Sequence, residues 1–238
     1  LASCCNQYPY SHELTVNAKD ALVETEQGTL CGYIEEGIYT FKGIKYAKAE
    51  RFMAPENPDS WDGVQTALYY GNQCHQAPRL TWKDDAEAFL YQWDDGQQSD
   101  DCQYLNIWTK GINDNKKRPV MVWLHGGGYA MGASSELPFY DGANLAKKDV
   151  VLVSINHRLN ILGFMDISDY GEKYKYSGSC GVLDMIKALE WVNENIEAYS
   201  GDPDTVTIFG QSGGGGKVNI LLDEPKAKGL FNKGIIES

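Results

Sequence analysis

One serine near the end of the chain stands in a setting that suits a nucleophile. Ser212 lies in the run Gly210-Gln211-Ser212-Gly213-Gly214, which follows the apolar segment TVTIF. A strand that turns sharply into a helix through small residues exposes such a serine at the strand end, and the helix N-terminus favours negative charge beside it. The pattern predicts a nucleophile elbow, the turn that carries the reactive serine of many hydrolases.

The same glycines also suggest a phosphate-binding loop, because residues 213–216 are all glycine and precede Lys217. That motif requires a glycine, four residues and then Gly-Lys-Ser/Thr, whose hydroxyl holds a magnesium ion. Gln211 occupies the first glycine position and Val218 follows the lysine, so two required positions differ. The hydrolase interpretation is therefore favoured.

A second glycine-rich segment, LHGGGY at residues 124–129, follows another apolar run. Glycines directly after a buried strand let backbone N–H groups point into a site without side chains in the way. Such donors, together with the N–H of Gly213, would hold the oxyanion of a tetrahedral intermediate. An ordinary glycine-rich loop is the alternative, and the elbow in the same chain argues against it. Together the two motifs predict acyl transfer through Ser212.

The segments around these motifs indicate an α/β fold. Three unalternated apolar runs, RPVMVWL, DVVLVSIN and DTVTIFG, predict strands buried on both faces of a mostly parallel sheet. Between the last two runs, apolar residues recur at helical spacing: Leu183, Ile186, Leu189, Val192 and Ile196. Short β-like runs in residues 21–46 predict small antiparallel strands at a sheet edge. We expect a polar tail at residues 1–20, then a single α/β domain over residues 21–238.

Composition excludes several partners. The formal net charge is −12, and the longest basic run is KKR at residues 116–118. Nucleic acid and anionic membrane surfaces are therefore poor partners on electrostatic grounds. No apolar run approaches the length of a membrane span. We assign no metal and no cofactor.

The cysteines bear on the compartment. The opening LASCC resembles the bacterial lipobox, in which Cys4 would carry a lipid; a plain N-terminal tail is the alternative. In an exported chain, Cys74 and Cys102 would close a loop by a disulfide, whereas two buried thiols are the other interpretation. Cys31 and Cys180 lie in apolar or helical contexts that suit structural residues.

The chain also resembles a known family. The following segments occur in the order found in type-B carboxylesterases, the family of the cholinesterases and bacterial para-nitrobenzyl esterases: FKGIKYA, RFMAPENPDSW, SDDCQYLNIW, VMVWLHGGGYAMG, VVLVSINHRLNILGF, GVLDMIKALEWVNENIEAYSGDPDTVTIFGQSGGG and LFNKGIIES. The resemblance runs from about residue 21 to the last residue and covers the N-terminal half of that family.

This resemblance implies an α/β-hydrolase fold with the active site at the foot of a gorge. Ser212 would be the nucleophile, and the N–H groups of Gly127, Gly128 and Gly213 the oxyanion hole. The segment between Cys74 and Cys102 would match the family's first disulfide loop, which walls the gorge. Four aromatic residues of that loop would contact an acyl or alcohol group, or simply pack at its surface: Trp82, Phe89, Tyr91 and Trp93.

Three positions depart from the family pattern. Gln211 stands where glutamate is usual, which removes a negative charge beside the nucleophile and predicts a weaker preference for cationic esters. Lys45 replaces a proline and His157 replaces a tyrosine. Neither Lys45 nor His157 is expected to take part in the predicted reaction.

The larger departure concerns the rest of the triad. A serine hydrolase needs an imidazole base and an acid, which in this fold follow the serine. All four histidines, at positions 12, 75, 125 and 157, precede Ser212. We expect an exported bacterial enzyme truncated on both sides, inactive alone and lacking its C-terminal half. A non-catalytic adhesion module on the same fold, or a second chain that supplies the missing half, are the alternatives.

Overall fold

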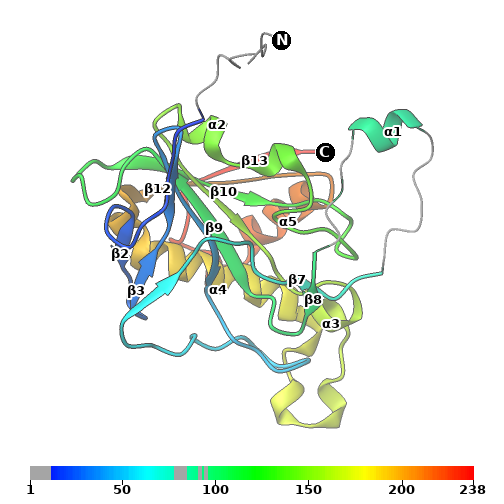
Figure 1. Ribbon diagram of the computed structural model, residues 1–238. Helices are drawn as coiled ribbons and strands as arrows, with labels where there is room; N and C mark the ends of the chain where they lie inside the picture. The colour runs from blue at the N-terminus through cyan, green and yellow to red at the C-terminus, as the bar shows by residue number, and fades with distance from the viewer. Residues whose placement is uncertain (1–11, 78–84, 91–92, 94–95) are drawn as a thin grey trace.

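The computed structural model describes residues 12–77, 85–90, 93 and 96–238. Its centre is an eight-stranded sheet in the order β1-β4-β5-β9-β11-β10-β12-β13 (Figure 1). These strands are β1 (Leu14–Thr15), β4 (Tyr33–Glu35), β5 (Ile38–Lys45), β9 (Tyr104–Thr109), β11 (Val151–Ile155), β10 (Arg118–Leu124), β12 (Gly201–Gln211) and β13 (Lys233–Glu237).

The half of the sheet that carries the two glycine motifs is parallel. Strands β11, β10, β12 and β13 run in the same direction, and β1, β4, β5 and β9 pair antiparallel along the other half. All five residues of β11 are buried, as its unalternated apolar sequence predicts. The register pairs Leu124 of β10 with Gly210 of β12. Both glycine motifs therefore begin at the same edge of the sheet.

The predicted antiparallel strands of residues 21–46 are present, but they divide between two sheets. Strands β4 and β5 join the edge of the central sheet. Strands β2 (Leu22–Glu24) and β3 (Thr29–Cys31) instead form a separate sheet with β6 (Val64–Thr66). A third small sheet pairs β7 (Gln73–Cys74) with β8 (Gln98–Ser99).

Helices cover the central sheet and bury its core. The α-helices are α1 (Asp85–Leu90), α2 (Ala143–Ala146), α3 (Asn160–Phe164), α4 (Cys180–Asn195) and α5 (Gly213–Asp223). Short 3-10 turns lie at Pro138–Tyr140, Ser168–Tyr170, Glu172–Tyr174, Ser177–Ser179, Ile196–Tyr199 and Pro225–Ala227. The main apolar core includes residues of β10 and β12 with Leu189 and Val192 of α4 and Leu221 of α5. Helix α4 has the predicted apolar spacing, and Ile196 falls in the 3-10 turn that continues it.

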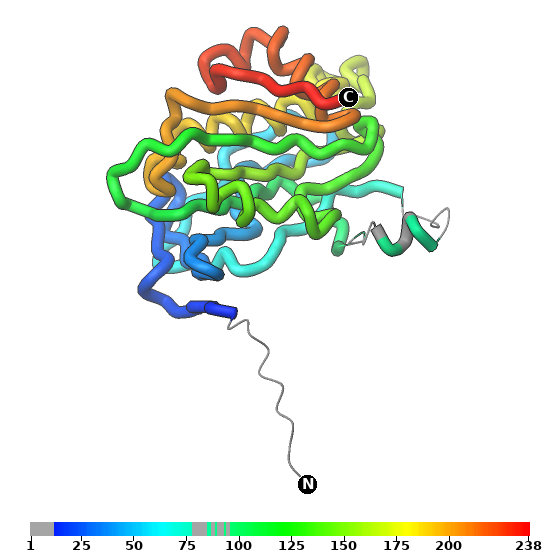
Figure 2. Tube along the Cα trace, turned by 90° about the horizontal axis from the view of Figure 1, so that it is seen from above, coloured from blue at the N-terminus to red at the C-terminus, as the bar shows by residue number. Residues whose placement is uncertain are grey.

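Strand β13 lies at one end of the central sheet, beside β12 (red and orange in Figure 2). The sequence predicts the start of a buried strand here. The strand forms, but each of its five residues is exposed, since among the described residues β12 is its only partner strand. Within the same described ranges, no helix is long and apolar enough to cross a membrane.

A buried ion pair ties α4 to the loop after β11. Arg158 donates from Nε and Nη2 to the two carboxylate oxygens of Asp184, at 2.8 and 2.7 Å. Its backbone N–H also donates to Asp184, and its Nη1 donates to the carbonyls of Glu50 and Met53. The Asp184 side chain is fully buried. The pair therefore fastens helix α4 and residues 50–53 to the sheet.

We expect Asp184→Asn to lower the free energy of unfolding by about 3–5 kcal/mol, because it leaves the buried Arg158 guanidinium without its counter-charge. Urea unfolding followed by circular dichroism measures this. Asp169→Asn, at an exposed position, is the matched control and should unfold at the wild-type midpoint. Equal midpoints for the two variants would show that the pair contributes nothing to stability.

Candidate active site

The turn after β12 has the strained geometry of a nucleophile elbow. Ser212 follows the strand directly, with φ of 57° and ψ of −124°, and α5 begins at the next residue. A positive φ is costly for a residue with a Cβ and is kept only where the surroundings enforce it. The Ser212 N–H donates to the carbonyl of Glu237 in β13 at 2.6 Å, which holds the turn in place. Ser212 is exposed at the end of the strand, as the sequence predicts.

The loop after β10 lies directly against this turn. A Cβ added at Gly126 would stand 3.5 Å from the Cβ of Ser212, and one added at Gly213 would stand 2.6 Å from the backbone nitrogen of Gly128. Gly127 and Gly128 both have positive φ, 86° and 59°. Over the described ranges, no acceptor is hydrogen-bonded to the backbone N–H of Gly127, Gly128 or Gly213. The structure therefore brings together the three backbone donors that the resemblance singles out.

Glycines make this close approach feasible. A Cβ at Gly214 would lie 2.1 Å from the carbonyl oxygen of Leu124, and one at Gly210 would lie 2.6 Å from the same atom. A Cβ at Gly216 would lie 2.6 Å from the hydroxyl of Tyr129. The first turn of α5 thus packs backbone against backbone on the end of β10, with no space for side chains between them.

Comparison with known proteins identifies the family to which this chain belongs. The model of the carboxylesterase family matches residues 19–238. The chain belongs to the carboxylesterase family. It is 44% identical over 222 residues to the para-nitrobenzyl esterase of Bacillus subtilis, covering 91% of this chain and 43% of that protein. It is 39% identical over 208 residues to the human cocaine esterase, covering 85% of this chain and 36% of that protein.

Solved structures of this family give the same result. An esterase from Clostridium hathewayi, described as able to hydrolyse aliphatic aromatic polyesters, superposes with a TM-score of 0.89 at 46% identity, covering 94% of this chain and 44% of that one. The carboxylesterase EST55 of Geobacillus stearothermophilus gives a TM-score of 0.81 at 43% identity, covering 91% of this chain and 43% of that one. The predicted α/β-hydrolase fold is confirmed, and the chain spans less than half the length of these relatives.

The histidines of this carboxylesterase chain lie in surface ion pairs or in the core. His12 and His75 contact Glu35 and Asp100 at 3.1 and 3.6 Å. His125 and His157 are buried and stacked, with ring centroids 5.0 Å apart. Burial, and then the nearby charge of Lys217, hold the pKa of His157 well below its usual value. Between described residues, no hydrogen bond joins Ser212 to a histidine.

Lys217 has a role that sequence reasoning missed. Its spacing after the glycines resembles a phosphate-binding lysine, yet its side chain is fully buried in α5. Its Nζ donates to the carbonyl of His125 at 2.7 Å and to that of Gly126 at 3.4 Å. Burial lowers the pKa of Lys217 to about 7, and the charge of Glu136 opposes this shift. The lysine therefore contacts the glycine loop and not a phosphate, and only its burial reveals this.

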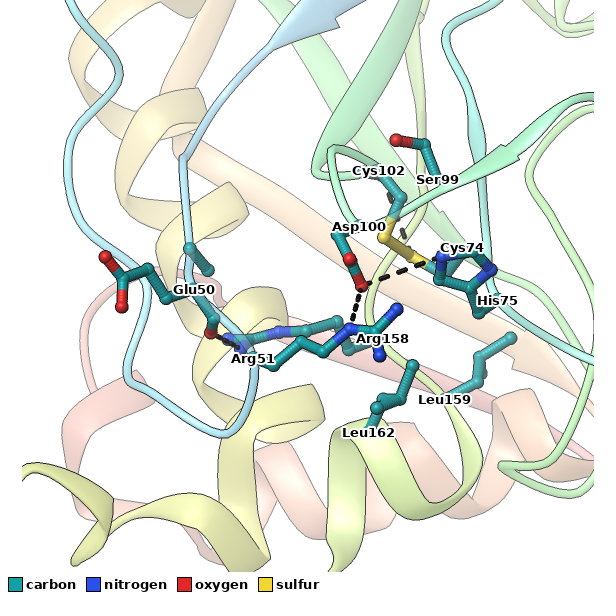
Figure 3. Close-up of a pocket in the computed structure, with 11 residues that line it drawn as sticks. Glu50, Arg51, Cys74, His75, Ser99, Asp100, Cys102, Arg158, Leu159 and Leu162 are labelled. Carbon is teal, nitrogen blue, oxygen red and sulfur yellow. Dashed lines mark hydrogen bonds and ion pairs between the residues drawn. A yellow bond between two sulfur atoms is a disulfide. The ribbon is translucent and has the colours of Figure 1, made fainter.

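The predicted disulfide between Cys74 and Cys102 is present. Beside it, Asp100 accepts a hydrogen bond from Arg51 at 2.8 Å and contacts His75 (Figure 3). The hollow drawn there has a volume of about 10 Å³, which accommodates about one water molecule and excludes an ester substrate. The disulfide and these contacts fasten the base of the loop to the domain.

The aromatic residues of the disulfide loop stay a prediction. Trp82 and Tyr91 lie outside the described residues, as does Cys4 at the N-terminus. Phe89 in α1 is 79% exposed and Trp93 is half-buried. The other two cysteines, Cys31 and Cys180, are buried thiols, and burial raises the pKa of each. Over the described residues, no group of three His, Cys, Asp or Glu side chains could hold a metal ion.

A larger cavity opens on the sheet beside the elbow. Its volume is about 440 Å³. Gln211 and Glu237 line it at the elbow, Asp141 and Asn144 add polar groups, and the rest of the lining is apolar or aromatic: Trp123, Pro138, Phe139, Tyr140, Leu145, Leu152 and Phe209. Gln211 itself is exposed. The side chain at position 211, one residue before the serine, therefore lines this cavity.

Gly214→Ala is expected to lower the free energy of unfolding by about 1–3 kcal/mol, because the new methyl group must displace the backbone at Leu124. Urea unfolding measures the change. Gly215→Ala is the matched control in the same turn, where the nearest atom to the new Cβ is 3.2 Å away and belongs to the side chain of Ile236. If the two variants unfold alike, the backbone contact does not constrain the site.

Proposed function

We propose that this chain supplies the nucleophile and the oxyanion hole of a carboxylic-ester hydrolase. The observation that carries the proposal is the exposed serine on a strained elbow, beside backbone N–H groups that have no acceptor among the described residues. A binding module on this fold has no use for a serine held at positive φ. Family membership and relatives named as esterases further support hydrolysis.

The chemistry follows from this arrangement. The Ser212 Oγ forms a bond to the acyl carbon of the ester, and the electron pair of the carbonyl moves to its oxygen. The N–H groups of Gly127, Gly128 and Gly213 hold that oxyanion, and the N-terminus of α5 adds to the positive potential. The oxyanion then collapses, the alcohol leaves and an acyl-serine forms, which water hydrolyses by the same steps.

The serine proton has to reach a base that the four histidines of this chain do not provide. We infer that the imidazole and its acidic partner come from polypeptide beyond these residues. The length of the relatives supports this, since the chain covers only 43% of the Bacillus subtilis esterase. That remaining polypeptide is the proposed partner of this half. Cys4 as a lipid anchor belongs to the same set of proposals.

Export to an oxidising compartment is a further part of the proposal. The disulfide between Cys74 and Cys102 supports it, because cytosolic thiols are kept reduced. A chain exported from a bacterium, either free or lipid-anchored in the cell envelope, fits this bond.

Ser212→Ala in the protein expressed from the complete source gene is expected to lower kcat for p-nitrophenyl esters by about 10⁴-fold or more, because no other group forms the acyl-enzyme. Initial rates of nitrophenol release measure this. Ser60→Ala, at an exposed position, is the control and should keep the wild-type rate. Undiminished hydrolysis by the Ser212 variant would refute the proposed nucleophile.

Gln211→Glu is expected to raise the preference for a cationic ester over its neutral isostere by about two- to tenfold, because it places a negative charge next to the serine. The ratio of kcat/KM for butyrylcholine and 3,3-dimethylbutyl butyrate measures this preference. Gln65→Glu, exposed on β6, makes the same charge change in a different sheet and controls for net charge. An unchanged ratio in the Gln211 variant would show that the charge at position 211 does not affect the preference for cationic esters.

A further inference from the structure

Lys217 carries a fully buried amino group that is hydrogen-bonded to backbone carbonyls. The charge of Glu136 acts on this group, but its hydrogen bonds go to the carbonyls of His125 and Gly126. Removing such a group from water is costly unless it is well hydrogen-bonded. Packing alone does not require a lysine here, because an unbranched apolar side chain fills similar space at a lower desolvation cost. The position therefore calls for an explanation in terms of what the amino group binds.

The ammonium is directed at one short piece of backbone. Its two carbonyl partners, His125 and Gly126, are consecutive and lie immediately before Gly127 and Gly128. The ring of Tyr129, which follows these glycines, lies with its centroid 5.7 Å from Nζ. Lys217 therefore joins helix α5, which begins at the elbow, to both ends of the glycine loop.

Peptide geometry links these carbonyls to the proposed oxyanion donors. The carbonyl of Gly126 and the N–H of Gly127 belong to the same peptide unit, which is planar and trans like every other described one. In a trans peptide the carbonyl and the N–H point in opposite directions. An ammonium that holds the Gly126 carbonyl on one side fixes the Gly127 N–H on the other. A charged donor on the carbonyl also polarises the unit and makes its N–H a stronger donor.

We propose that Lys217 is a positioning residue for the oxyanion hole, whose buried amino group orients and polarises the two peptide units that precede Gly127, and with them the Gly127 N–H. The inference rests on the proposed esterase function and identifies what holds its oxyanion donors in place. The glycine contacts of α5 set how near the loop comes to the serine. Lys217 sets which way the peptide groups before Gly127 face, together with the ring of His125, whose Nδ1 lies 3.0 Å from the Gly126 carbonyl oxygen.

The test uses Lys217→Met in the protein expressed from the complete source gene. We expect kcat for a p-nitrophenyl ester to fall about 10- to 100-fold, with KM unchanged within about twofold, because the donors act on charge that develops in the transition state. Affinity for a trifluoromethyl ketone, which forms an oxyanion adduct with the serine, should fall by the same factor. Affinity for the matching methyl ketone, bound largely as the unreacted carbonyl, should stay constant.

Two further variants separate charge from hydrogen bonding and from surface effects. Lys217→Gln keeps an N–H donor without the charge and should give a smaller loss of the same kind. Lys228→Met removes an exposed lysine just beyond α5 and should match the wild type. Thermal unfolding of each variant reports on the fold.

The outcomes are distinct. A folded Lys217→Met protein with wild-type kcat, or with equal losses for both ketones, overturns the positioning role and leaves the esterase function standing. If neither Lys217 variant folds, the lysine serves the fold as a whole, and the assignment to the oxyanion hole is overturned. A wild-type protein that hydrolyses no ester refutes the proposed function itself.

Discussion

The contact between the first turn of α5 and the end of β10 is the constraint on which the rest of the site depends. The carbonyl of Leu124 lies where Cβ atoms at Gly210 and Gly214 would stand, so strand, turn and helix meet backbone to backbone. Because the helix starts this close to the neighbouring strand, the chain has to reverse within one residue. Ser212 absorbs that reversal at a positive φ. The exposed serine is thus a consequence of close packing between two glycine segments.

The core determines where this contact forms. Parallel pairing of β10 with β12 runs in register from Val120 and Val206 to Leu124 and Gly210. A slip by one residue would expose the buried face of each strand, so the apolar pattern fixes the register strongly. The apolar residues of β10 and β12 that are buried beneath α4 therefore determine which atoms of the glycine loop meet the elbow, although they lie several residues away from it. In this fold the positions of the site's atoms follow from the packing of residues that take no part in chemistry.

Local sequence was enough for some of these features and not for others. The elbow, the glycine loop and α4 follow from short-range rules on glycine, apolar runs and helical spacing, and the structure contains all three. The disulfide needed the family resemblance, because spacing alone left Cys74 and Cys102 as two thiols or one bond. The division of the N-terminal strands between two sheets depends on long-range pairing, which adjacent residues do not encode. The exposure of β13 likewise depends on its neighbours in space. Its sequence, KGIIE, contains two apolar residues and does not by itself determine whether the strand is covered.

Lys217 shows most clearly why some features of the site could not be predicted from the sequence. On the sequence, a lysine after four glycines is either a phosphate ligand or a solvated side chain. Its actual partners are backbone carbonyls about ninety residues earlier in the chain, and carbonyls carry no sequence signature. Two costly features, a serine at positive φ and a buried lysine amino group, converge on the same loop from one helix terminus. Folding stability alone would favour glycine at position 212 and an apolar residue at position 217. Where local rules are broken twice within six residues, function is the stronger explanation than packing.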